Sequence, residues 1–241
     1  MTQPIGEIIE VSTTSFVAQC LDKPRATEPR LSDPPPFGSF VKIQPRRPEP
    51  DATDEEFGGR ASEESDPFVW RIASSDPLLA PNVTFALVCN ARTTSLAPGR
   101  RPVALGMDDE DEIRLRQPQI FELLTTEFSG LLVGYTMADG RVRRHLPPVP
   151  PRIHSQVTTC EAAEVRSLTR DLSFLRSVLA GGGGVPCDAS PEDLVAACLR
   201  AGWAAWDGQD DDFLVQAGRK LLELLGDDYQ RLQAIMNAVI Y

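Results

Sequence analysis

The 241-residue chain contains few of the residues and motifs that mark common active sites. It has only two histidines, His145 and His154, and its five cysteines lie far apart without any C-x-x-C pair. Zinc sites need cysteine and histidine ligands at short, regular spacings, so this sequence predicts no metal site. The phosphate-binding loop G-x-x-x-x-G-K-[S/T] and the G-x-S-x-G turn of serine hydrolases are also missing. We therefore predict a protein that is not an enzyme and that holds no cofactor.

Long apolar runs and an excess of positive charge are missing as well. No run of about 18 apolar residues occurs, so no membrane span is predicted. The formal net charge is −11, which argues against a phosphate-binding surface over most of the protein and disfavours nucleic acid as a partner. The odd number of cysteines and the lack of a signal peptide indicate reduced thiols, and hence a cytoplasmic protein.

The first half of the chain contains short runs of β-branched and aromatic residues, separated by small polar residues. The runs are Ile5–Val11, Phe16–Leu21, Phe37–Ile43 and Val83–Cys89. This pattern is typical of strands joined by turns. Within the third run, Val41 and Ile43 can share one face of a strand, whereas Phe40 must lie on the other. Several short strands with turns between them predict a small closed barrel or a sandwich.

The middle of the chain adds a predicted helical segment and a hairpin. Five consecutive acidic residues favour the start of a helix, and apolar residues at helical spacing extend that helical segment over residues 108–128, with an interruption at Pro118. The hairpin joins Gly130–Thr136 to Val142–Leu146. The high content of Pro, Asp and Glu in residues 44–67 predicts an acidic inserted loop. This loop is either simply solvated or an arm for a basic partner.

The last third of the chain has a helical pattern. Apolar residues recur at three- and four-residue steps from Glu161 to Leu179, and further helices are predicted over Pro191–Trp206, from Asp210 or Asp211 to Gly226, and from Asp227 onward. Short connections between them predict a small α-helical bundle. The fold class is therefore α+β, with a β domain over residues 1–155 that includes the helical segment 108–128, and an α-helical domain over residues 156–241.

Several motifs in the β-rich half resemble the HAS barrel, the N-terminal barrel of HerA-type DNA translocases. They are I-G-x-I-I at residues 5–9 with S-T-T at 12–14, F-G-S-F-V at 37–41 and N-x-R-T-T at 90–94. The last is the proline-rich stretch 145–151, which is followed by Glu161 and Glu164. A related barrel occurs in the α and β subunits of F-type ATP synthases. The resemblance covers roughly residues 4–165. It implies a barrel that docks on barrels of the same kind, but the ATPase domain of those translocases has no counterpart here.

Four residues are candidates for binding a partner. Trp70 is either a core residue, which we favour, or an anchor in an interface. Arg141, Arg143 and Arg144 form a basic cluster beside the predicted hairpin, either as a solvated edge that prevents further strand pairing or as a patch for phosphate or an acidic partner. The sequence thus favours an adaptor or assembly protein whose partner is a ring-forming ATPase or a second copy. The alternative is a nucleic-acid-binding accessory protein that uses this basic cluster.

Overall fold

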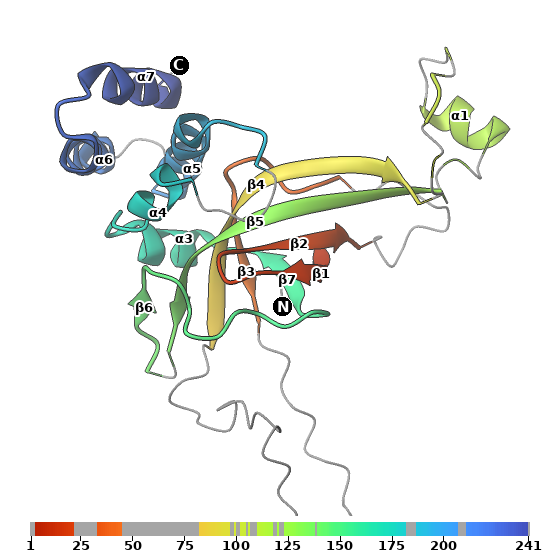
Figure 1. Cartoon of the computed structure of the whole chain (residues 1–241), viewed down its shortest axis with the longest axis horizontal. Coiled ribbons are helices and arrows are strands. Elements are labelled where there is room, and N and C mark those ends of the chain that lie inside the picture. Colours follow the sequence, from red (N-terminus) through yellow and green to blue (C-terminus); the bar gives the residue numbers. More distant parts are fainter. Residues whose placement is uncertain are drawn as a thin grey trace, which may run out of the picture.

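The chain folds into an α+β structure with the strands in its first part and most helices near its C-terminus (Figure 1). The computed structural model describes residues 3–21, 33–44, 82–96, 99, 102–104, 106, 110–117, 120, 123–137, 139–181, 187–206 and 211–240. The strands are β1 (Gly6–Val11), β2 (Ser15–Cys20), β3 (Phe40–Ile43), β4 (Val83–Ser95), β5 (Leu124–Thr136), β6 (Val142–Arg143) and β7 (Gln156–Thr159). The helices are α1 (Glu110–Arg116), α3 (Ala162–Thr169), α4 (Leu175–Leu179), α5 (Pro191–Ala205), α6 (Asp211–Leu225) and α7 (Tyr229–Ile240).

Within the described residues, antiparallel strands close into a barrel in the order β2-β1-β7-β3-β4-β5. Pairing of β2 with β5 completes the circle, and β6 pairs with the last residues of β5 along the same edge, beyond β2. The polar turn between β1 and β2 is held by Ser12, whose hydroxyl accepts hydrogen bonds from the amides of Thr14 and Ser15 at 3.3 and 3.1 Å. Closure satisfies the backbone groups that an open sheet would leave at its edges. The prediction of a small closed barrel is confirmed.

Alternation along the strands divides the buried residues between two cores. Val41 and Ile43 on β3 point into the barrel, whereas Phe40 packs under the C-terminal helices. The same division holds on β5, where Leu132 faces inward and Leu131 and Val133 face the helices. Because helices cover their outer faces, β3 and the middle of β5 are buried on both sides. The face-sharing predicted for Val41 and Ile43 is confirmed.

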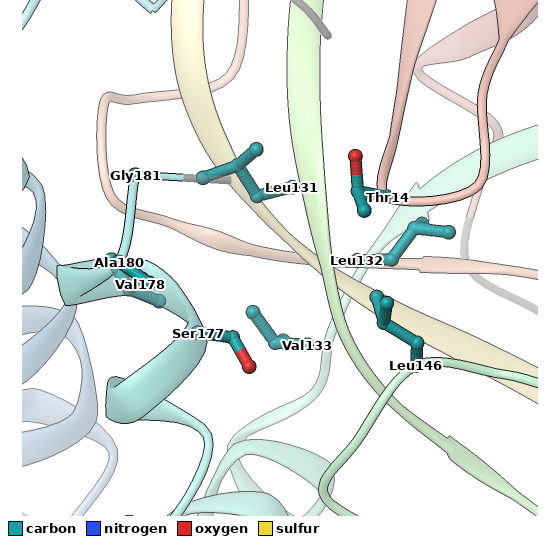
Figure 2. Close-up of a pocket in the computed structure, with 9 residues that line it drawn as sticks. All are labelled: Thr14, Leu131, Leu132, Val133, Leu146, Ser177, Val178, Ala180 and Gly181. Atoms are coloured by element: carbon teal, nitrogen blue, oxygen red, sulfur yellow. The ribbon is translucent and has the colours of Figure 1, made fainter. Parts of the chain in front are cut away.

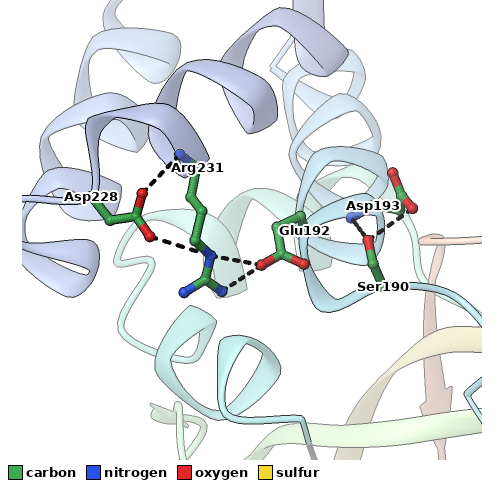
Figure 3. Close-up of polar contacts among 5 residues, drawn as sticks. All are labelled: Ser190, Glu192, Asp193, Asp228 and Arg231. Carbon is green, nitrogen blue, oxygen red and sulfur yellow. Dashed lines mark hydrogen bonds and ion pairs between the residues drawn. The ribbon is translucent and has the colours of Figure 1, made fainter.

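The C-terminal helices are attached to the barrel and to one another by specific polar contacts. Ser190 caps α5 by accepting a hydrogen bond from the amide of Asp193 at 3.0 Å (Figure 3). Arg231 at the start of α7 donates to Glu192 at the start of α5, with Nε and Oε1 2.8 Å apart. Hydrogen bonding from its own backbone amide, followed by the Arg231 guanidinium, lowers the pKa of Glu192. The contact between Arg231 and Glu192 fixes the N-terminal ends of α5 and α7 against each other.

Three predictions about the elements need correction. Among the described residues of the helical segment predicted over 108–128, Glu110–Arg116 and Ile120 are helical, whereas residues from Leu124 onward belong to β5. They pair with β4 from Ser95 back to Asn90, and this continuous ladder outweighs their helical spacing. The single helix predicted from Glu161 to Leu179 is divided into α3 and α4. A strand that the sequence pattern did not indicate, β7, lies between β1 and β3.

The division of the chain at residues 155 and 156 and the helical bundle stay predictions. The structure shows that α5 contacts α3, α4, α6 and α7. It also shows that these helices share one hydrophobic core with the outer faces of β3, β4 and β5. Burial of a large apolar side chain contributes about 1.5–3 kcal/mol. We therefore expect the helices and the barrel to stabilise each other.

Candidate interaction surface

A two-stranded ribbon leaves the barrel between β4 and β5. It pairs Thr93–Ser95 of β4 with Leu124–Thr126 of β5, beyond Glu127, the last β5 residue that also pairs with β2. Figure 1 shows this ribbon running away from the helices toward α1, which lies at its far end. Across the ribbon, the hydroxyls of Thr93 and Thr126 are 2.9 Å apart and hydrogen-bonded. Such cross-strand pairs stabilise an antiparallel ribbon.

The far end of the ribbon exposes large apolar side chains. We define the ribbon tip as Leu96, Val103, Leu115 and Leu123, whose exposed fractions are 55%, 79%, 85% and 41%. Leu96 and Leu123 are neighbours, because the amide of Leu96 donates to the carbonyl of Leu123 at 2.7 Å. A single exposed leucine is ordinary, but several within one short projecting section favour contact with another molecule. The sequence pattern singled out none of these four residues for binding, and it placed Leu123 in the helical segment 108–128 and not beside the strand β5.

A second set of exposed apolar side chains lies on the two last helices. Val215 and Leu222 are seven residues apart on one face of α6, with exposed fractions of 49% and 42%, and Tyr229 and Ile240 are exposed on α7. In Figure 1, α6 and α7 lie at the end of the molecule opposite the ribbon tip. The protein therefore exposes apolar residues at both ends of its long axis.

The predicted basic cluster is present on and beside β6, but its arginines have different surroundings. Arg141 is exposed and pairs with Asp139, with 3.6 Å between its Nε and the carboxylate. Arg143 is also exposed, and its backbone pairs with Tyr135 of β5. Arg144 is partly buried and turns toward α3. The structure thus leaves two of the three side chains on the surface.

Arg144 has a structural contact that the sequence did not reveal. Its Nε donates to the carbonyl of Leu168 at 2.7 Å, and its Nη2 donates to the carbonyl of Ser167 at 2.6 Å. These carbonyls belong to the last turn of α3, where the helix leaves acceptors unpaired and where its dipole favours a cation. Arg144 therefore joins the hairpin to α3. Trp70, the fourth candidate, lies outside the described residues, as do residues 45–67 of the predicted acidic loop.

A pocket of about 300 Å³ lies where the barrel meets α4 (Figure 2). Leu131 and Val133 of β5, Leu146 of the proline-rich stretch and Val178 of α4 form its apolar walls. The hydroxyl-bearing residues Thr14 and Ser177 also line it, and among the residues that the structure describes no charged side chain does. Small-molecule sites of this size combine apolar walls with a few polar groups. The lining therefore suits an uncharged apolar group better than an anion or a sugar.

Two absences hold for the part of the chain that the structure describes. No group of three or more His, Cys, Asp or Glu side chains in that part of the chain is placed to hold a metal ion. None of its helices combines the length and the apolar content needed to cross a bilayer.

Comparisons with known proteins give no family for this chain. No protein-family model matches it, and no curated protein matches it either. The closed barrel is compatible with the HAS-barrel resemblance, which itself stays a prediction from the motifs in the sequence.

Proposed function

We propose that this protein is a non-enzymatic adaptor or assembly protein, which docks on a protein partner through the barrel and its ribbon. The observation that carries the proposal is the ribbon tip, where Leu96 and Leu115 are more than half exposed at the end of a projecting arm. Burying one such side chain in an interface contributes about 1.5–3 kcal/mol, which is roughly a tenfold to hundredfold change in affinity. A projecting arm can also contact a partner while the rest of the protein surface stays clear of that partner.

The resemblance to HAS barrels suggests the kind of partner. In the translocases that the motifs resemble, such barrels are associated with a ring of ATPase subunits. A barrel without its own ATPase domain would dock on such a ring, or on a second copy of itself, without hydrolysing nucleotide. The helices at the opposite end would remain available to recruit a different protein through the exposed face of α6 and α7.

The test compares two variants that remove matched apolar pairs from opposite ends of the molecule. Leu96→Asp with Leu115→Asp changes the ribbon tip, and Val215→Asp with Leu222→Asp changes α6. All four side chains are at least 42% exposed, so both variants should fold. The tagged full-length proteins are used to capture partners from lysate of the source cells, and bound proteins are identified by mass spectrometry. Light scattering measures self-association.

We expect one defined partner, or the dimer, to be recovered at least about tenfold less with the ribbon-tip variant than with wild type or the α6 variant. Equal recovery with all three proteins would show that the ribbon tip is not the docking surface. No defined partner and no self-association with wild type would overturn the proposal. Binding of single-stranded DNA that weakens steeply with salt, and that is lost in Arg141→Ala with Arg143→Ala, would instead support the nucleic-acid alternative.

A further inference from the structure

Two cysteines that are far apart in the sequence meet beside the register shift of β4. Cys89 lies on β4 between Val88 and Asn90, where the register with β5 shifts, and its side chain is buried under the helices. Cys187 lies just before α5 and is half-buried. Its thiol donates to the carbonyl of Cys89 at 3.3 Å. The thiol of Cys89 donates to the carbonyl of Ser129 at 3.5 Å.

The surroundings of Cys89 reflect this contact. Burial, followed by the charge and the hydrogen bond of the adjoining Cys187 thiol, raises the pKa of Cys89 to about 12. The Cys187 sulfur lies 3.3 Å from the carbonyl oxygen of Cys89, so the two residues are in direct contact. Both cysteines are free thiols in the structure, as are Cys20, Cys160 and Cys198.

We propose that Cys89 and Cys187 form a reversible disulfide when the protein meets hydrogen peroxide or a related peroxide. The half-buried Cys187 is the thiol that a peroxide can reach, so it reacts first and becomes a sulfenic acid, with release of water. The sulfur of Cys89 then attacks the sulfenic sulfur, the sulfur–sulfur bond forms, and a second water leaves. In total, two thiols and one peroxide give one disulfide and two waters, and the peroxide is reduced.

The bond would join two elements that only noncovalent contacts hold at present. Cys89 lies at the register shift of β4, and Cys187 precedes the N-terminal cap of α5, Ser190. A disulfide here would fix this part of β4 to the start of α5. This inference rests on the two thiols alone and does not depend on the docking function proposed above.

The experiment uses the full-length protein, purified with reductant, desalted and treated with hydrogen peroxide. Digestion without reductant and mass spectrometry should find a peptide pair joined through Cys89 and Cys187, which dithiothreitol separates. Cys187→Ser should lose this pair, whereas Cys198→Ser, which changes a buried thiol on α5, should keep it. The oxidised wild type should also unfold at a higher temperature than the reduced protein, because the cross-link restricts the unfolded chain.

Two mass-spectrometric results would overturn the inference. One is oxidation of Cys187 to sulfinic acid or to a mixed disulfide with added glutathione, without the internal cross-link. The other is a cross-link that forms equally well after unfolding in urea and that pairs Cys187 with several cysteines, which would show that the native arrangement does not select Cys89. A Cys187→Ser protein whose melting temperature rises on oxidation as much as that of wild type would also contradict the proposed cross-link.

Discussion

The ion pair between Lys42 on β3 and Glu164 on α3 offers a sharp test of how the helices are held on the barrel. The ammonium of Lys42 contacts both carboxylate oxygens of Glu164, at 2.7 and 2.8 Å. The two side chains differ in burial, because that of Lys42 is only 8% exposed whereas that of Glu164 is 29% exposed. Removing either partner leaves the other charge unpaired, and the cost depends on how well water can reach that charge.

This asymmetry predicts unequal effects for two nearly isosteric substitutions. Glu164→Gln leaves a buried ammonium, for which the usual cost of breaking a buried pair is about 3–5 kcal/mol. We expect about 2–3 kcal/mol, because the glutamine oxygen still accepts one hydrogen bond and can also keep the contact with the amide of Glu161. Lys42→Met leaves a carboxylate that water can partly hydrate, and the methionine fills the same space. We expect this variant to lose no more than about 1 kcal/mol.

Urea unfolding of the two variants, of the double variant and of wild type measures these free energies. The double variant should be about as stable as Lys42→Met, because the unpaired ammonium is then absent, and the coupling energy should be about 2 kcal/mol. If Glu164→Gln lies within about 0.5 kcal/mol of wild type, or if Lys42→Met costs as much as Glu164→Gln, the burial argument is wrong. A change in m, the slope of the unfolding free energy against urea concentration, would show instead that the free energies of the variants cannot be compared directly.

Two other pairs of substitutions test the barrel core and the hairpin contact. A β-carbon at Gly130 would lie 2.5 Å from a ring atom of Phe16 in the barrel core, so Gly130→Ala should cost about 1–3 kcal/mol, measured by urea unfolding. A β-carbon at Gly218 on α6 would meet no atom closer than 4.0 Å, so Gly218→Ala should stabilise the protein by about 0.5–1 kcal/mol. A gain in stability with Gly130→Ala would contradict the packing of Phe16 against Gly130. Arg144→Ala loses two hydrogen bonds to α3 and should lower the melting temperature by an amount equivalent to about 1–2 kcal/mol. Arg143→Ala should change stability by less than about 0.5 kcal/mol, and equal effects at both arginines would exclude the structural role of Arg144.

Much of the fold follows from local patterns in the sequence. The turn at Ser12 and the cap at Ser190 are short-range features, since each involves residues only two or three positions apart. Alternation in the third apolar run predicted which residues of β3 share a face, because successive side chains in a strand point to opposite sides. These features could be predicted because neighbouring residues decide them.

The candidate sites depended on contacts between distant parts of the chain. β7 is only four residues long and has little apolar pattern of its own, so its place between β1 and β3 came from pairing partners far away in the sequence. Pairing with β4 likewise decided that residues from Leu124 belong to a strand, and this pairing created the ribbon tip. No local signal distinguishes Arg144, which meets the end of α3, from its exposed neighbour Arg143.

The sequence by itself determined the strand-forming runs, the turns, the helix starts and the alternation of apolar residues, because each arises from interactions within a few residues. Only the tertiary structure decided how the barrel closes, how far the ribbon projects, and that Cys89 and Cys187 meet. Such contacts join segments separated by many residues, and they form only when burial of a shared core compensates for the entropy lost in bringing those segments together.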